Sequence, residues 1–307
     1  MAVADPIEER CRRVAGLVAC AASDWRQILQ NDAVQAVLIC SPSAHHAECA
    51  IHALGHGKHI YVEKPLASTL ADAEAVLQAW QGSNLVATVG FNYRHHPLFM
   101  KVRDLVTSGK LGRLTGAQSV FTSGGQWIHE WKRKRASAGG VLLDLAGHHI
   151  DLVHFVLGQR VCAVSARVAS RYSEQDTAWL RMTLQDGTVV QSFFSLYGTD
   201  ANRFDIYGES GRASLDYLRK TLQIVHPPQS SRIRRALKTV GNELSRVRGV
   251  FPASDSSYAA AFSQFISAVA NGGGRVTPDL ADGLLVSKVI DAAERSAATG
   301  RDIPVLL

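Results

Sequence analysis

The sequence has few cysteines, and its five cysteines lack the close pairing that disulfide frameworks and zinc sites use. No apolar run approaches the roughly 20 residues needed to cross a bilayer. The first residues have neither the basic start nor the apolar stretch of a signal peptide. We therefore expect a cytoplasmic protein with no metal site and no membrane partner.

The excess of positive charge is concentrated in one segment. Residues 227–250 carry six basic residues and one acidic residue, whereas the net charge of the whole chain is +6. No aromatic residue interleaves with these arginines, so stacking on nucleic acid bases has no support. We interpret the segment as a solvated insertion and expect no nucleic-acid partner, although an anionic partner stays open. A second basic run, residues 132–135, lies beside Trp127 and Trp131, and we interpret it as the rim of a cleft.

Apolar runs and amphipathic segments alternate in the first part of the chain. Residues 36–40, 59–62 and 86–91 are typical of buried strands. Between them, residues 44–56 and 69–80 carry apolar side chains at helical spacing. This alternation predicts right-handed crossovers and a parallel sheet.

The pattern changes after about residue 112. Segments of β type follow one another with turn residues between them, and Asp186-Gly187 predicts a hairpin. Helices are predicted at residues 141–157, 258–270 and 280–299. The fold class is therefore α/β. A Rossmann-like parallel sheet at residues 1–112 precedes an α+β domain at residues 113–307 with a large, mostly antiparallel sheet.

The first residues of the chain resemble the second strand of a dinucleotide-binding unit. Asp5 stands at the tip of a short predicted strand, and Pro6 suits the first turn of a helix. In such a unit this acidic residue binds the adenosine ribose about 20 residues after a G-x-G-x-x-G turn. No such turn precedes Asp5. We expect that roughly 30 residues are missing through a misassigned start, a genuinely shortened form being the alternative.

Three further stretches carry candidate catalytic and binding residues in a fixed order. Residues 40–46 read CSPSAHH, residues 57–67 read GKHIYVEKPLA, and residues 139–151 read GGVLLDLAGHHID. Together they resemble the glucose-fructose oxidoreductase, inositol dehydrogenase and rhizopine-catabolism family, written Gfo/Idh/MocA. An isolated E-K-P is a weak match, whereas E-K-P followed by G-G-x-x-x-D-x-x-x-H-x-x-D is specific. The resemblance covers essentially the whole chain, with Ala146 where the family commonly has glycine.

The resemblance implies an oxidoreductase that transfers a hydride between a sugar, sugar-derivative or cyclitol hydroxyl and NAD or NADP. It implies that Lys64 contacts both the substrate and the nicotinamide ribose. Asn92-Tyr93-Arg94 resembles the family's G-x-N-x-R stretch, which brings Arg94 towards the nicotinamide, with a surface salt bridge as the alternative. A homo-oligomer formed through the C-terminal sheet is also expected. The expected cofactor-binding residues are Asp5, Ser41, Pro42, His46, Glu63, Lys64 and Arg94.

The chemistry of the residues supports the same positions. Lys64 is predicted at the carboxyl end of a parallel strand, where open α/β sheets bind their ligands. Held between Glu63 and a proline, it can donate a hydrogen bond to a substrate hydroxyl. For an isolated lysine, an ion pair on the surface is the alternative.

The predicted helix at residues 141–157 carries the other candidates. Asp144, His148 and Asp151 share one helical face, and His149 points roughly 140° away from it. A histidine near neutrality is a natural proton acceptor for alcohol oxidation, and a carboxylate can orient it or bind the hydroxyl. The alternative is an aspartate at a helix N-terminus beside a core histidine, and Asp151 is expected to be structural.

The sequence thus predicts Lys64, Asp144 and His148 as catalytic residues, and these three with Trp127 as substrate-binding residues. His129 and Trp131 are candidates for specificity. Two other functions stay open at this point. One is a non-catalytic sensor or regulator with the same fold, and the other is a glycoside hydrolase that uses NAD to oxidise its sugar transiently.

Overall fold

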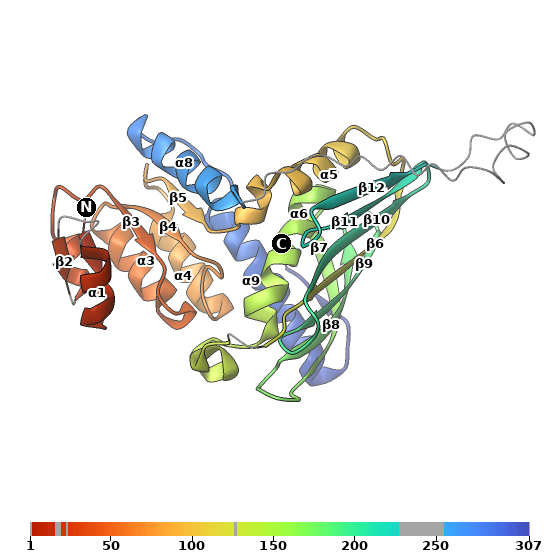
Figure 1. The fold of residues 1–307 in the computed structure, drawn as a ribbon, viewed down its shortest axis with the longest axis horizontal. Helices are drawn as coiled ribbons and strands as arrows, with labels where there is room; N and C mark the ends of the chain where they lie inside the picture. The colour runs from red at the N-terminus through yellow and green to blue at the C-terminus, as the bar shows by residue number, and fades with distance from the viewer. Residues whose placement is uncertain (1, 16–19, 23, 126–127, 227–254, 307) are drawn as a thin grey trace, which may run out of the picture. The chain divides into compact units, whose positions relative to one another are not determined.

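The computed structural model describes residues 2–15, 20–22, 24–125, 128–226 and 255–306 (Figure 1). Trp127 and the basic segment at 227–250 lie outside these residues. The chain forms two compact units, one of Met1–Gly90 with Phe262–Leu284 and one of Phe91–Ala261 with Leu285–Leu307. The domain boundary predicted near residue 112 stays a prediction.

The first unit contains short parallel strands in two sheets. One sheet pairs β1 with β2, and the other has the order β3-β4-β5. Within the described residues, no hydrogen-bonded ladder joins β1 to β3. The predicted Rossmann-like parallel arrangement is confirmed, and β4 and β5 are almost fully buried. The strands are β1 (Ala2–Ala4), β2 (Cys20–Ala22), β3 (Ala36–Ile39), β4 (His59–Val62) and β5 (Ala87–Val89).

Helices alternate with these strands, and the two predicted from helical spacing at residues 44–56 and 69–80 are confirmed. They are α1 (Glu8–Ala15), α2 (Trp25–Leu29), α3 (His46–Gly55) and α4 (Leu70–Trp80). Helix α1 begins at Glu8, not at Pro6 as predicted, because Asp5 Oδ1 accepts the Ile7 N–H at 2.8 Å in a turn. Helix α4 begins where Thr69 Oγ1 accepts the Asp72 N–H at 3.1 Å, an N-cap contact.

Helix α8 (Ser257–Ala270) returns to the first unit. The ring centroids of Phe262 and Phe265 lie 4.6 and 5.9 Å from that of Tyr61 on β4. Burial of aromatic side chains contributes much of the packing energy of such a contact. The predicted helix at 258–270 is confirmed.

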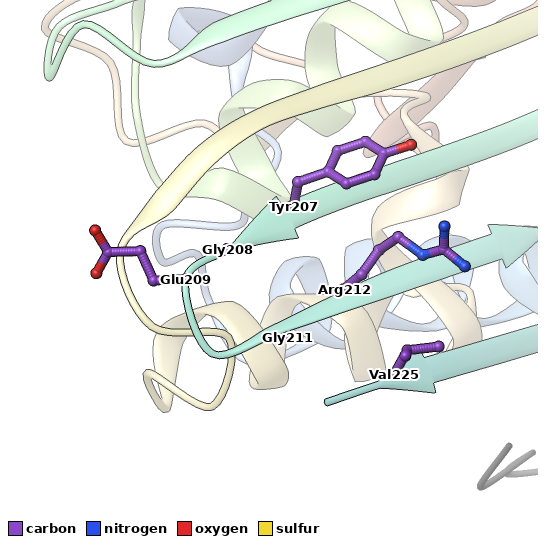
Figure 2. Close-up of a pocket in the computed structure, with 6 residues that line it drawn as sticks. All are labelled: Tyr207, Gly208, Glu209, Gly211, Arg212 and Val225. Atoms are coloured by element: carbon purple, nitrogen blue, oxygen red, sulfur yellow. The ribbon is translucent and has the colours of Figure 1, made fainter. Parts of the chain in front are cut away.

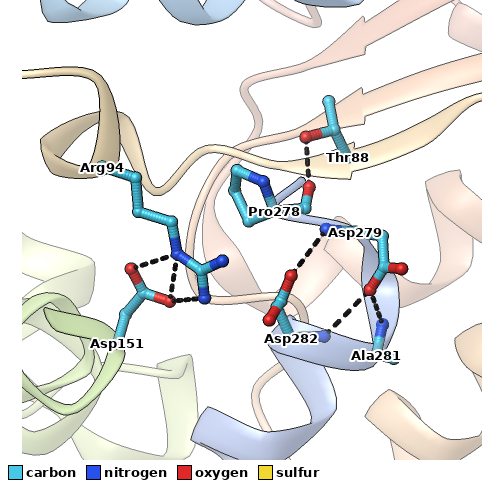
Figure 3. Close-up of polar contacts among 7 residues, drawn as sticks. All are labelled: Thr88, Arg94, Asp151, Pro278, Asp279, Ala281 and Asp282. Atoms are coloured by element: carbon cyan, nitrogen blue, oxygen red, sulfur yellow. Dashed lines mark hydrogen bonds and ion pairs between the residues drawn. The ribbon is translucent and has the colours of Figure 1, made fainter. Parts of the chain in front are cut away.

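Helix α9 (Leu280–Thr299) begins with a capping box on the edge of β5 (Figure 3). Asp279 Oδ1 accepts the N–H groups of Ala281 and Asp282 at 2.9 and 3.1 Å, and Asp282 Oδ2 accepts the Asp279 N–H at 3.0 Å. The Pro278 carbonyl accepts hydrogen bonds from the Thr88 hydroxyl and the Val89 N–H. These contacts fix the start of α9 on β5.

The second unit contains an eight-stranded sheet of order β12-β11-β10-β6-β9-β8-β7-β13. Only β6 and β9 pair in parallel among its neighbouring strands, so the predicted mostly antiparallel sheet is confirmed. The predicted hairpin joins β8 to β9, and Gly187 there has a φ of +86° that favours glycine. The strands are β6 (Leu114–Thr122), β7 (Val161–Ala169), β8 (Thr177–Leu184), β9 (Val189–Ser195), β10 (Ala201–Gly208), β11 (Gly211–Asp216), β12 (Thr221–Val225) and β13 (Ile303–Pro304).

Helices α5 (Pro97–Thr107) and α6 (Gly147–Leu157) belong to the second unit. Helix α6 and the C-terminal part of α9 lie along one face of the sheet (Figure 1). The predicted helix at 141–157 forms, but its first part, Leu142–Ala146, is π-helical. Helix α5 was not predicted, although Pro97 at its first position and the His96 side chain, which accepts the Leu98 N–H, are ordinary start signals.

In the described part of the chain, one helical stretch, Arg135–Leu157, has the length and apolar composition of a membrane span. Within its most apolar window, 78% is buried inside the chain. A core helix passes the same test of length and composition, so this stretch is weak evidence for a membrane.

Candidate active site

Lys64 follows β4 directly, at the carboxyl end of a parallel strand, and its side chain is half-buried. Glu63 Oε2 accepts the backbone N–H of Lys64 at 3.3 Å. Burial raises the pKa of Glu63, and the nearby Lys64 ammonium partly opposes that rise. Gly90 leaves the room that the Glu63 side chain occupies, because a Cβ there would lie 3.0 Å from Glu63 Oε2.

His46 connects two loops at the same edge of the sheet. Its Nδ1 lies 2.6 Å from the Pro65 carbonyl oxygen, and its Nε2 lies 2.9 Å from the Ser41 carbonyl oxygen. Burial lowers the pKa of His46 although both carbonyls favour the charged ring. A neutral imidazole donates to only one of the two oxygens. His46 therefore ties the Ser41-Pro42 loop to the cis Lys64–Pro65 turn.

The polar groups of the first unit fit a dinucleotide. The Ser41 hydroxyl oxygen is buried, and the Cys49 thiol lies within hydrogen-bonding reach of it. Asp5 stands after β1 with 28% of its side chain exposed, and its Oδ2 lies 3.7 Å from Arg10. A carboxylate after β1 and a hydroxyl after β3 are suited to ribose and phosphate groups at the carboxyl ends of parallel strands.

In the second unit, Asp144 lies on the π-helical turn. The Gly147 N–H donates to the Leu142 carbonyl, which adds one residue to this turn of the helix. Turns of this kind are frequent at functional sites. The prediction that Asp144, His148 and Asp151 share one helical face assumed a regular α-helix. That regular geometry begins only at Gly147, so it applies to His148 and Asp151 but not to Asp144.

His148 and His149 have different surroundings, as the helical spacing predicted. The half-buried His148 ring stacks on Tyr93, with centroids 4.8 Å apart and planes at 29°. His149 is fully buried and packs on Phe121, with ring centroids 5.3 Å apart, and on Phe194 of β9, at 5.7 Å. Burial lowers the pKa of His149 to about 4.

Asn202 links the two environments. Its Oδ1 lies 3.1 Å from His149 Nε2, and its Nδ2 donates to the Tyr93 hydroxyl at 3.1 Å. The Tyr93 ring on which His148 stacks is therefore held by a buried network that begins at His149. Sequence reasoning missed Asn202, because its partners come from distant parts of the chain.

Arg94 and Asp151 form a buried ion pair (Figure 3). Arg94 Nε lies 3.0 Å from both carboxylate oxygens of Asp151, and one terminal nitrogen lies 2.5 Å from Oδ1. The side chains are 9% and 1% exposed. This pair fixes the turn Asn92–His95 on α6, so the expected structural role of Asp151 has support. The cofactor-binding role of Arg94 stays a prediction.

Lys132 is a residue whose contact the sequence did not predict. Its Nζ lies 2.7 Å from Asp144 Oδ1, and the two side chains are 27% and 17% exposed. Sequence reasoning placed Lys132 in a basic run beside a cleft but gave it no partner. The signal was present in Gly139-Gly140, which bring this run back against the start of the helix.

The remaining candidates have fewer contacts. The Trp131 ring centroid lies 5.5 Å from Lys132 Nζ, His129 is exposed, and Trp127 lies outside the described residues. Across the described residues, no group of three or more His, Cys, Asp and Glu side chains is arranged to hold a metal ion. An open pocket of about 370 Å³ in the second unit contains none of the predicted site residues (Figure 2). Its lining residues are Tyr207, Gly208, Glu209, Gly211, Arg212 and Val225.

Two family models match the chain. Residues 1–91 match "Oxidoreductase family, NAD-binding Rossmann fold", and residues 103–307 match "Oxidoreductase family, C-terminal alpha/beta domain", both of the Gfo/Idh/MocA group. Together they cover nearly the whole chain.

Several curated proteins are similar to it. The uncharacterized oxidoreductase YrbE of Bacillus subtilis is 31% identical, over 65% of this chain and 60% of its own length. Levoglucosan dehydrogenase of Pseudarthrobacter phenanthrenivorans is 28% identical, over 90% of this chain and 81% of its own. Myo-inositol 2-dehydrogenase of Thermotoga maritima is 26% identical, over 77% and 73%.

A solved structure shares the fold. Levoglucosan dehydrogenase in complex with NADH and levoglucosan superposes with a TM-score of 0.87 at 24% identity, over 100% of this chain and 90% of that chain. At this level of identity the likeness supports the architecture alone.

Proposed function

The chain belongs to the Gfo/Idh/MocA oxidoreductase family, and from this membership we propose that it is an NAD(P)-dependent dehydrogenase of sugar or cyclitol hydroxyls. The named relatives are a levoglucosan and a myo-inositol dehydrogenase, so an uncharged polyhydroxylated ring is the substrate class that we infer. The observation that carries the proposal is the placement of Lys64 after β4, with its backbone held between Glu63 and the His46-bound turn.

The residues that would hold the cofactor lie after the parallel strands. Asp5 would accept hydrogen bonds from the adenosine ribose hydroxyls. The loop beginning with Ser41-Pro42 would contact the part of the cofactor beyond that ribose. Glu63 and Lys64 would contact its nicotinamide end. NAD or NADP held there would supply the acceptor for the hydride of the substrate carbon.

The proton leaves the substrate hydroxyl separately from the hydride. His148 is the proposed proton acceptor, because its ring is half-buried and stacks on Tyr93. The His149 ring is fully buried among core side chains. Asp144 orients His148 or binds the neighbouring hydroxyl. Lys64 donates a hydrogen bond that stabilises the developing alkoxide, an effect that is strong where water is excluded.

We also propose that the protein self-associates through its second unit. One face of the eight-stranded sheet carries Trp179, which is 40% exposed and lies 5.3 Å from Phe193 between ring centroids. Exposed aromatic residues on an open sheet face are typical of protein interfaces. Sedimentation at several protein concentrations, with Trp179→Glu as the variant, tests this association.

The test of the enzymatic proposal is the variant Lys64→Met, which keeps the apolar stem and removes the charge. We expect the turnover number for NAD(P) reduction with a panel of cyclitols and anhydrosugars to fall by about 10²–10³-fold. The matched control is Lys101→Met on the exposed side of α5, which should leave turnover unchanged.

Two outcomes would favour other functions. Release of free sugar without net reduction of NAD would indicate the glycoside hydrolase. A stable protein that binds no nucleotide and tolerates replacement of Lys64 and His148 would indicate the sensor. An unchanged turnover in Lys64→Met would remove Lys64 from the mechanism.

A further inference from the structure

A short segment, residues 129–137, crosses the start of the helix that carries Asp144, and we call it the strap. It consists of two single turns, Glu130–Arg133 and Arg135–Ser137. The Gly139 N–H donates to the Lys134 carbonyl at 3.0 Å, and the Gly140 N–H donates to the Lys132 carbonyl at 3.1 Å. The strap is thereby folded back on the residues that precede the helix.

The close approach of the strap depends on glycine. A Cβ at Gly139 would lie 2.3 Å from the Lys132 carbonyl oxygen, a distance that would force the strap to move. Gly140 has a φ of +98°, which residues with a side chain rarely adopt. The Gly139-Gly140 pair is thus a requirement for the position of the Lys132 backbone.

Two further contacts hold the second turn of the strap. Arg135 Nε donates to Glu294 Oε1 of α9 at 2.6 Å, and the Arg135 backbone N–H donates to Glu174 Oε2 at 2.7 Å. The Glu174 N–H in turn donates to the Arg133 carbonyl at 3.0 Å. With the backbone of residues 132–135 held in this way, the Lys132 side chain extends from a fixed position.

Three of the four basic residues of the strap have acidic partners. Arg133 lies 3.7 Å from Glu130, Arg135 pairs with Glu294, and Lys132 pairs with Asp144. The run therefore lacks the uniform positive field that would attract an anionic substrate. Of these ion pairs, only that of Lys132 with Asp144 includes a candidate catalytic residue.

We propose that Lys132 is a positioning residue that fixes the orientation of the Asp144 carboxylate, an inference that rests on the proposed dehydrogenase function. The 2.7 Å contact between Lys132 Nζ and Asp144 Oδ1 is a charge-assisted hydrogen bond, and such bonds are short and strong. A carboxylate accepts several hydrogen bonds at its two oxygens, so a bond at Oδ1 is compatible with a second contact to His148 or to a substrate hydroxyl.

The position of Asp144 makes this contact consequential. Asp144 lies on the π-helical turn, where the backbone has one residue more than a regular turn, and Lys132 joins its carboxylate to an anchored segment. A misplacement of a catalytic group by about 1 Å costs on the order of 10²-fold in rate. Loss of Lys132 should therefore act on the chemical step.

The test compares Lys132→Met, Lys132→Arg and Lys134→Met in the intact protein. The substrate probe is the polyol that gives the fastest NAD(P) reduction with the unmodified protein. For Lys132→Met we expect kcat to fall about 10- to 100-fold while KM for the polyol changes by less than about threefold. Lys132→Arg keeps the charge and should recover most of kcat. Lys134 is exposed on the same strap, so its variant should behave like the unmodified protein.

Two measurements exclude a merely structural effect. The melting temperature of Lys132→Met and its affinity for NADH, measured by calorimetry, should match those of the unmodified protein. Gly139→Ala should reproduce the loss in kcat, because it displaces the strap without changing a charge.

Two results would overturn the inference. A lowered KM with unchanged kcat in Lys132→Met would mean that Lys132 competes with the substrate for Asp144. Unchanged kinetics of that variant in an active protein would refute the positioning role while leaving the proposed function intact. If the unmodified protein reduces no cofactor with any polyol, the proposed function fails, and this inference fails with it.

Discussion

The burial of His149 predicts a specific loss of stability in acid. Burial lowers the pKa of this ring from its ordinary value of 6.5 to about 4, so the folded protein favours the neutral form. The unfolded chain binds more protons than the folded one between these two values, and stability therefore rises with pH across this window. The contribution of the neutral His149 ring to the free energy of unfolding is complete above the ordinary pKa. It decreases as the pH falls from about 6.5 to about 4 and changes little below that.

The magnitude follows from the shift. Each pKa unit corresponds to about 1.4 kcal/mol, so lowering the pH from about 7 to about 4 should remove on the order of 3 kcal/mol of the free energy of unfolding. The variant His149→Gln is uncharged at every pH and keeps an amide donor for Asn202 Oδ1. Its stability should therefore lack this part of the pH dependence.

The assay is urea unfolding at several pH values, followed by circular dichroism. The stability difference between the unmodified protein and His149→Gln should shrink by about 3 kcal/mol from neutral pH to about pH 4. Other titrating groups are present in both proteins and cancel in this difference. His45→Gln, a substitution of an exposed histidine, is measured beside it as the matched control. A curve for His149→Gln parallel to that of the unmodified protein would show that His149 is not a neutral core residue.

Three further predictions follow from the same contacts. Replacing the proposed proton acceptor, His148→Ala, should lower turnover by about 10²–10⁴-fold, whereas His149→Gln should leave the turnover of the folded fraction nearly unchanged; equal losses in steady-state assays would contradict the distinction between the two rings. Asp151→Leu should reduce the free energy of unfolding by about 3–5 kcal/mol, because it leaves the Arg94 guanidinium buried without its partner; the double variant Arg94→Met, Asp151→Leu should recover much of this in chemical denaturation, and no recovery would exclude a paired contribution. Asp5→Ala should weaken NAD binding by calorimetry more than it changes thermal stability, since the carboxylate is partly exposed after β1; unchanged affinity would remove Asp5 from the cofactor site.

The regular elements could be predicted wherever their signal is local. The strands β3, β4 and β5 are short apolar runs, and helices α8 and α9 show clear helical spacing. Helix α5 was passed over despite its start signals at His96 and Pro97. The π-helical turn at Leu142–Ala146 could not be predicted, because the bond from the Gly147 N–H to the Leu142 carbonyl depends on tertiary packing around the helix.

The candidate site could be predicted as a set of residues but not as a set of contacts. The motifs identified Lys64, Asp144 and His148 without their neighbours. The pair of Arg94 with Asp151 joins residues 57 positions apart, and the contact of Asn202 with Tyr93 joins residues 109 apart. Such partners are set by the tertiary fold, and a single sequence contains no periodic signal for them. The partner of Lys132, Asp144, is only 12 positions away, and the Gly139-Gly140 pair between them is the sequence signal for this close approach.

The central claim is that this protein removes a hydride from a carbon of a sugar or cyclitol ring and delivers it to nicotinamide. The most direct measurement uses a polyol deuterated at its carbon positions and follows deuterium into the nicotinamide ring by mass spectrometry. The account predicts one deuterium in each reduced cofactor, and a loss of this transfer in Lys64→Met. A folded, NADH-binding protein that transfers no deuterium from any cyclitol or sugar would contradict it.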